Sequence, residues 1–280
     1  MVKLEYAGQE VAVTETVIAL TNQRQRVRIE MQKLLEQDER FQVAGDIGKV
    51  SFGLYAAETL KAADGSVIPK DGLLEVVSCK EDGMATFQTD LPFGSFYLKE
   101  RSTDEHYQLG DRAYPIEFSY SGQEIAVVHL VANEGQPIEN HLIRGIVLGH
   151  KVDENGQAAP GAVMGLFRPE EKEFTEDAAL LISVSNEYGE FRFDDIPFGD
   201  WLVREIRQPE GFLLSETLYP VTIAEQNHVV EINVENIHIP PAPVNPPTGE
   251  ERRWRNLVMG LAAVAVGGAV ALFIIKKKKG

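Results

Sequence analysis

The chain repeats one ten-residue pattern, first as Leu91-Pro-Phe-Gly-Ser-Phe-Tyr-Leu-Lys-Glu100 and again as Ile196-Pro-Phe-Gly-Asp-Trp-Leu-Val-Arg-Glu205. Each copy has Pro-Phe-Gly, then alternating apolar and other residues, then a glutamate, at a constant offset of 105 (196 − 91). Alternation with a period of two predicts a strand with one apolar face. A copy this regular indicates one supersecondary unit that is used twice.

Glu100 and Glu205 continue the apolar face of the two predicted strands. A carboxylate that points into a core is costly unless it is paired or neutral. Each glutamate therefore requires a partner from elsewhere in its own repeat.

Many short alternating segments, turn signals between them and the lack of a long amphipathic pattern favour an all-β sandwich for each repeat. We expect the first sandwich over residues 23–139 and the second over residues 140–239. Residues 6–13 (YAGQEVAV) match residues 120–127 (YSGQEIAV). We therefore interpret residues 1–22 as the end of a further, upstream repeat, and the chain as the membrane-proximal part of a longer exported protein.

Each repeat has two more polar residues at positions predicted to face the core, a lysine in its first strand and an asparagine in its last. They are Lys33 and Asn133 in the first repeat, and Lys151 and Asn236 in the second. Burial lowers a lysine pKa from about 10.4 and raises a carboxyl pKa from about 4.3, so a buried Lys and Glu can exchange a proton and leave a nucleophilic amine.

If the asparagine carboxamide is within reach of the amine, a protonated glutamate can stabilise the tetrahedral intermediate and pass a proton to departing ammonia. We therefore predict one autocatalytic Lys–Asn isopeptide bond per repeat, assisted by Glu100 and Glu205. The bond forms once, so the chain is not an enzyme. The alternative is an ordinary strand-end lysine, a salt bridge and a turn asparagine in each repeat.

Composition excludes several other classes of site. The formal charge of −16 argues against a nucleic-acid partner. One cysteine gives no intrachain disulfide, and six scattered histidines have no metal-ligand spacing, so we expect no cofactor and no metal.

The C-terminal region has the features of a membrane anchor. Residues 257–275 are 19 uncharged residues, long enough as a helix of about 28 Å to cross a bilayer. Residues 276–280 form a basic cytoplasmic tail. Residues 240–256 form a proline-rich linker that holds a short motif. The motif consists of Asn245, Pro246, Pro247, Thr248 and Gly249.

The order of Pro-x-Thr-Gly, apolar span and basic tail resembles the cell-wall sorting signal of Gram-positive surface proteins. The resemblance implies that a sortase cleaves between Thr248 and Gly249 and joins Thr248 to peptidoglycan or to another pilin subunit. Asn245 stands where that family usually has leucine. The alternative is an ordinary transmembrane anchor after a proline-rich stalk.

The two repeats resemble the collagen-adhesin B-type repeat, the SpaA-like prealbumin fold of Gram-positive adhesins and pilins. Three motifs carry the resemblance: His150-Lys-Val-Asp-Glu-Asn-Gly156, Trp201-Leu-Val-Arg-Glu205 followed by Pro209-Glu-Gly-Phe212, and Ile232-Asn-Val-Glu-Asn236. It implies that Lys151 bonds to Asn236 with the assistance of Glu205. The first repeat departs from the pattern, because Asp104 and His106 replace Pro209 and Gly211.

We therefore expect a structural protein of the cell surface, an adhesin stalk or pilin-like subunit anchored to the cell wall by sortase, with one C-terminal helix in the membrane of the precursor. A host or glycan ligand is not identified by the sequence. The alternative function is a membrane-retained extracellular module that binds glycan or matrix protein.

Overall fold

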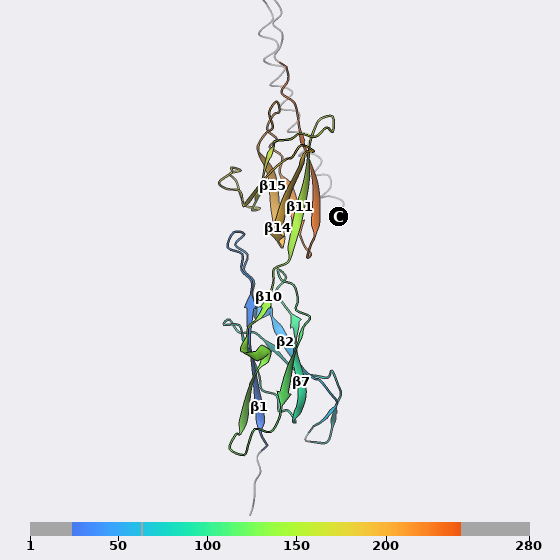
Figure 1. Cartoon of the computed structure of the whole chain (residues 1–280). Helices are drawn as coiled ribbons and strands as arrows, with labels where there is room; N and C mark the ends of the chain where they lie inside the picture. Colours follow the sequence, from blue (N-terminus) through green and yellow to red (C-terminus); the bar gives the residue numbers. More distant parts are fainter. Residues whose placement is uncertain (1–23, 63, 242–280) are drawn as a thin grey trace, which may run out of the picture. The chain divides into compact units, whose positions relative to one another are not determined.

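The structure, a computed structural model, describes residues 24–62 and 64–241. These residues form two β-sandwiches (Figure 1), so the predicted all-β fold is confirmed. The predicted segment 1–22, the motif of residues 245–249 and the apolar span of residues 257–275 lie outside the described residues. Among the residues that are described, no helix has the length and apolar character needed to cross a bilayer.

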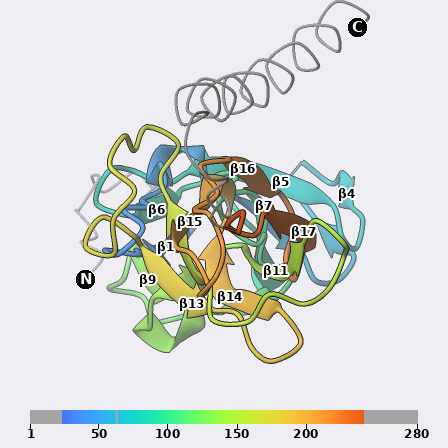
Figure 2. The same ribbon diagram turned by 90° about the horizontal axis from the view of Figure 1, so that it is seen from above.

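The first sandwich contains two four-stranded sheets and a small β3–β4 hairpin. One sheet comprises β1 (Arg26–Leu35), β6 (Met84–Phe87), β9 (Val127–Val131) and β10 (Ile138–Asn140), and the other β2 (Ser51–Ala56), β5 (Leu73–Ser78), β7 (Gly94–Ser102) and β8 (Ala113–Phe118). The hairpin strands are β3 (Leu60–Lys61) and β4 (Val67–Ile68), and two short 3₁₀ turns are η1 (Ile47–Lys49) and η2 (Ala132–Gly135). In the end-on view, β1, β6 and β9 are separated from β5 and β7 (Figure 2).

The second sandwich has a three-stranded and a four-stranded sheet. The first comprises β11 (Arg144–Asp153), β14 (Glu190–Pro197) and β17 (Val229–Asn236), and the second β12 (Val163–Phe167), β13 (Leu181–Val184), β15 (Gly199–Arg207) and β16 (Tyr219–Ile223). The repeated Pro-Phe-Gly stretches lead into β7 and β15, whose alternating side chains enter the cores as predicted. Phe96, Leu98, Trp201 and Val203 are all buried.

In both sandwiches the last strand runs parallel to the first. In the second, β17 keeps one register along β11, from Ile146 opposite Val229 to Asp153 opposite Asn236. In the first, the last strand is divided: the offset to β1 is 101 along β9 (131 − 30) and 105 along β10 (138 − 33). Four extra residues are therefore inserted between β9 and β10, where η2 lies.

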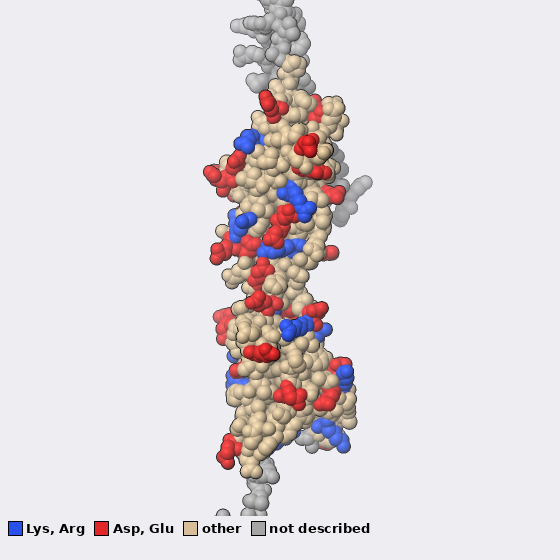
Figure 3. Space-filling view, in the orientation of Figure 1, with Lys and Arg blue, Asp and Glu red and all other residues tan. Residues whose placement is uncertain are grey.

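Charged side chains of both signs are distributed over the face shown in Figure 3. On the face shown in Figure 3, Lys and Arg alternate with more numerous Asp and Glu rather than gathering in one basic area.

Candidate functional site

The second sandwich brings Lys151, Glu205 and Asn236 together in its interior. Lys151 Nζ donates a short hydrogen bond to Asn236 Oδ1 and lies 3.5 Å from Glu205 Oε1. Asn236 Nδ2 donates to the same glutamate oxygen at 2.8 Å. The three residues are at most 2% exposed. The amine, the amide and the acid predicted from the sequence are therefore in mutual contact.

The first sandwich contains an equivalent group, but with a different asparagine. Lys33 Nζ donates to Asn140 Oδ1 at 2.6 Å and lies 3.4 Å from Glu100 Oε1. Asn140 Nδ2 donates to Glu100 Oε1 at 2.7 Å. The contacts among lysine, asparagine and glutamate thus join the same atoms in both sandwiches.

The structure corrects the prediction of Asn133 as the acceptor in the first sandwich. Asn133 lies in η2 with a left-handed φ of 54°, and its Nδ2 donates to the backbone oxygens of Gln136 and Pro137. The prediction assumed an unbroken last strand. The four inserted residues instead place Asn133 in η2, and the strand that pairs with β1 beside Lys33 is β10. The missed signal was the tripeptide Ile138-Glu-Asn140, which matches Val234-Glu-Asn236.

Strand register explains why the same three groups meet twice. Lys33 lies opposite Ile138 and Lys151 opposite Val234, and in each case the asparagine is two residues further along the parallel strand. A step of two residues keeps the side chain on the same face of the sheet. The asparagine therefore faces the same interior as the lysine.

Two turn glycines hold the backbone of the lysines. Lys33 N donates to Gly83 O at 2.9 Å, and Lys151 N donates to Gly189 O at 2.6 Å. Both glycines have a left-handed φ, and a Cβ at either would lie within 2.3 Å of the lysine carbonyl oxygen. Glycine is thus required on both conformational and steric grounds.

Each glutamate is fixed through its second oxygen. Gly110 N donates to Glu100 Oε2 and Ser215 N donates to Glu205 Oε2, both at 2.6 Å. The two donors are related by the same offset of 105 (215 − 110). The Oε1 atom is consequently the one that faces both the lysine and the asparagine.

Burial controls the charge state of the two lysines. It lowers the pKa of Lys33 and of Lys151 below the usual lysine value, and the adjacent glutamates oppose this effect without cancelling it. A lowered pKa increases the fraction of neutral, nucleophilic amine. Burial also raises the pKa of the neighbouring Cys79 thiol to about 11, which keeps that sulfur in its less nucleophilic thiol form.

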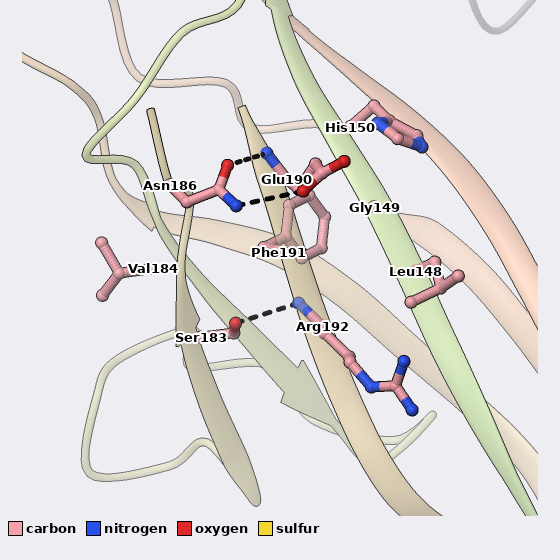
Figure 4. A pocket seen from close by; sticks show the side chains of 9 residues that line it. All are labelled: Leu148, Gly149, His150, Ser183, Val184, Asn186, Glu190, Phe191 and Arg192. Atoms are coloured by element: carbon pink, nitrogen blue, oxygen red, sulfur yellow. Dashed lines mark hydrogen bonds between the residues drawn. The ribbon is translucent and has the colours of Figure 1, made fainter. Parts of the chain in front are cut away.

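A separate hollow of about 440 Å³ lies between β13 and β14 in the second sandwich (Figure 4). Four of its residues are hydrogen-bonded to one another in two pairs. Asn186 Nδ2 donates to Glu190 Oε2 and Asn186 Oδ1 accepts from Glu190 N, while Ser183 Oγ accepts from Arg192 N. These contacts join β13, β14 and the turn between them. None of the hollow's residues belongs to either Lys–Asn–Glu group.

Comparison with known proteins identifies the fold of the second sandwich. Residues 145–238 match the family model of SpaA, a prealbumin-like fold domain. For this second repeat, the resemblance to the SpaA-like prealbumin fold inferred above from the sequence is confirmed. No curated protein is detectably similar to the chain.

Several solved structures resemble the chain at low sequence identity. The TIE protein of Bacillus anthracis has a TM-score of 0.55 at 18% identity, over 78% of this chain and 35% of that protein. This chain therefore spans about a third of the TIE protein. The minor pilin GBS52 of Streptococcus agalactiae has a TM-score of 0.33 at 16% identity, over 80% of this chain and 100% of the pilin. A C-terminal fragment of the pilus adhesin SpaC from Lactobacillus rhamnosus GG has a TM-score of 0.44 at 11% identity, over 76% and 99%.

Proposed function

We propose that the chain is a structural protein of the Gram-positive cell surface, an adhesin stalk or pilin-like subunit, whose two sandwiches are each crosslinked by an autocatalytic Lys–Asn isopeptide bond. The observation that carries the proposal is the recurrence of one buried Lys–Asn–Glu geometry at Lys33, Asn140 and Glu100 and at Lys151, Asn236 and Glu205.

The reaction is an intramolecular transamidation. The neutral lysine Nζ attacks the asparagine Cγ, and the glutamate Oε1 lies against both Nζ and Nδ2, the two nitrogens between which a proton must move. One proton passes from Nζ through glutamate Oε1 to Nδ2. The Nζ–Cγ bond forms, the Cγ–Nδ2 bond breaks, and one ammonia leaves.

The anchoring part of the proposal concerns residues outside the described structure. A sortase would cleave after Thr248 and transfer it to peptidoglycan or to another pilin subunit, which would leave the protein on the wall. The match of residues 145–238 to a family named for SpaA and the order of motif, apolar span and basic tail support this. A Thr248→Ala variant is expected to stay with the membrane fraction, whereas the unaltered chain moves to the wall fraction.

Intact-mass spectrometry of the denatured chain tests the crosslinks. The proposal predicts a deficit of two ammonia molecules, and Asn140→Ala and Asn236→Ala are each expected to restore one. Asn133→Ala is the matched control and is expected to leave both deficits in place. A folded protein with its full formula mass would refute the proposal, and loss of a deficit in Asn133→Ala would refute the assignment of Asn140.

A further inference from the structure

The two crosslinking groups differ in how the amide nitrogen is held. In the first sandwich Asn140 Nδ2 donates to Glu100 Oε1 at 2.7 Å and also to Thr103 Oγ1 at 2.9 Å. In the second, Asn236 Nδ2 donates to Glu205 Oε1 at 2.8 Å, and no second acceptor for it is found among the residues that the structure describes. The repeat offset puts Gln208 (103 + 105) at the position of Thr103, and Gln208 is exposed.

The segment that carries Thr103 is held by the residues that set the first repeat apart. The buried Asp104 carboxylate accepts from Lys49 Nζ at 2.8 Å and contacts His106 Nδ1 at 2.5 Å. It also accepts from the backbone of His106 at 3.2 Å and of Asp46 at 3.4 Å. The second repeat has Pro209 and Gly211 where Asp104 and His106 stand. Where the second repeat has a proline and a glycine, the first repeat therefore has a buried carboxylate, next to Thr103, that is fixed by an ion pair and several hydrogen bonds.

We propose that Thr103 is a positioning residue for the first crosslink, whose hydroxyl holds the leaving nitrogen of Asn140. This inference rests on the crosslinking reaction proposed above. With Oδ1 bound by Lys33 Nζ and Nδ2 bound by both Glu100 and Thr103, the carboxamide has one orientation, with its oxygen towards the amine and its nitrogen towards the acid and the hydroxyl. Orienting reacting groups in this way lowers the barrier of an intramolecular step.

The hydroxyl also supplies a hydrogen-bond acceptor for Nδ2 as this nitrogen gains a proton. The amide nitrogen begins with two N–H donors, and on taking up a proton in the tetrahedral intermediate it has three. Thr103 Oγ1 provides a second acceptor for this nitrogen while Glu100 Oε1 transfers the proton. No atom of Thr103 gains or loses a bond, and ammonia remains the leaving group.

The test follows crosslinking in the whole chain as it is made by cell-free synthesis. Samples are quenched in acid at intervals, digested, and assigned by mass to the first or the second site. Thr103→Val and Thr103→Ala remove the acceptor, whereas Thr103→Ser retains it. Loss of one net hydrogen bond predicts that the first site reacts about three- to tenfold more slowly in the two former variants. The second site is expected to be unchanged, and Thr103→Ser to be close to the unaltered chain.

Gln208→Ala is the matched control and is expected to alter neither site. Equal rates for Thr103→Ala and the unaltered chain would overturn this inference while leaving the proposed function intact. So would equal slowing of the serine and alanine variants, because the hydroxyl would then not decide the rate. If Thr103→Val does not fold, the comparison of alanine with serine decides. Absence of ammonia loss at the first site in the unaltered chain would overturn the proposed crosslink itself, and with it this inference.

Discussion

At the scale of single residues, the buried lysines make the stability of the uncrosslinked fold depend on pH. Burial, opposed by Glu100, Cys79 and Glu139, leaves the pKa of Lys33 below its ordinary value. The unfolded chain, with its lysine at about 10.4, then binds more protons than the folded one, so stability rises with pH until the unfolded lysine also deprotonates.

We therefore expect the urea midpoint of Asn140→Ala, which has no acceptor and stays uncrosslinked, to rise between pH 7 and pH 9. Lys33→Met in that background removes the titrating amine and should give a shallower dependence. It should be less stable than Asn140→Ala at pH 7, by about 3 to 5 kcal/mol, because Glu100 is left buried without its amine partner. A midpoint that fell with pH in Asn140→Ala would contradict the lowered lysine pKa.

The pKa of Asp104 is lowered as well, in this case because its charged form is stabilised. Burial tends to raise the pKa of its carboxyl, but the hydrogen bonds from Lys49, His106 and two backbone amides outweigh burial and leave the pKa well below the usual value. The stabilisation from a depressed carboxyl pKa is present above the unfolded value of about 4 and is lost as the pH falls below it.

We expect Asp104→Asn to cost about 1 to 3 kcal/mol at pH 7, since it weakens charge-assisted hydrogen bonds to a side chain that is 2% exposed. The difference between variant and parent in denaturant melts should shrink between pH 4 and pH 2. Asp200→Asn, an exposed carboxylate that accepts from Thr222, is the control. A difference independent of pH would show that Asp104 does not act through its charge.

At the scale of single elements, strand parity in the sequence predicted the second site and misplaced the first. In β17 only one face is apolar, and Val230, Ile232 and Val234 lead correctly to Asn236. In β9 both faces are apolar, and the face with the parity of Asn133 is the exposed one: Val127 and Val131 are exposed, whereas Val128 is buried. Alternation of residue types cannot distinguish two apolar faces, and it does not report an insertion of four residues between β9 and β10.

In β11 the alternation of apolar residues is too weak to predict which face is buried. Lys151 shares its face with Val147, but also with Gly145 and Gly149, which have no side chain to bury. The structure has a register shift between Gly145 and Val147, and the ring of Phe191 occupies the space that a Cβ at Gly149 would need. The space beside Gly149 is thus filled by an aromatic residue from β14. The sequence of β11 alone does not show this contact, because Phe191 is distant from Gly149 in the chain.

The turn before β14 contains Gly189, whose close contact with the Lys151 backbone can be tested by substitution. A Cβ at Gly189 would lie 2.2 Å from Lys151 O, so Gly189→Ala must displace the lysine backbone. We expect this variant to slow the second crosslink by about tenfold or more, because small misplacements in a reacting pair have large effects on rate. Gly156→Ala is the control, since Gly156 has a similar φ of +78° with no atom within 4 Å. Its cost is limited to backbone strain of about 1 kcal/mol. Equal rates of crosslinking in the two variants would show that the close approach at Gly189 is not needed.

At the scale of the whole molecule, the proposed crosslinks would determine which parts of the chain bear tension. A load that enters at Arg24 would follow β1 to Lys33, cross to Asn140, continue along β11 to Lys151, and cross again to Asn236. Residues 34–139 and 152–235 lie outside this covalent path. The two proposed bonds would close loops of 106 residues (139 − 33) and 84 residues (235 − 151), and the chain-entropy relation gives a stabilisation of about 4 to 5 kcal/mol for each.

Single-molecule pulling between handles at Arg24 and Pro241 tests this path. The crosslinked chain should stretch without any unfolding step, because neither loop can enter the path of the force. Asn140→Ala should add one step from 106 released residues (139 − 33), a contour of about 350 Å at the extended length per residue. Asn236→Ala should add a shorter step, from 84 residues (235 − 151). Since the two step lengths differ, each identifies its own bond, and Asn133→Ala should add neither. An unfolding step in the unaltered chain would show that the lysine and asparagine of that sandwich are in contact without being covalently joined.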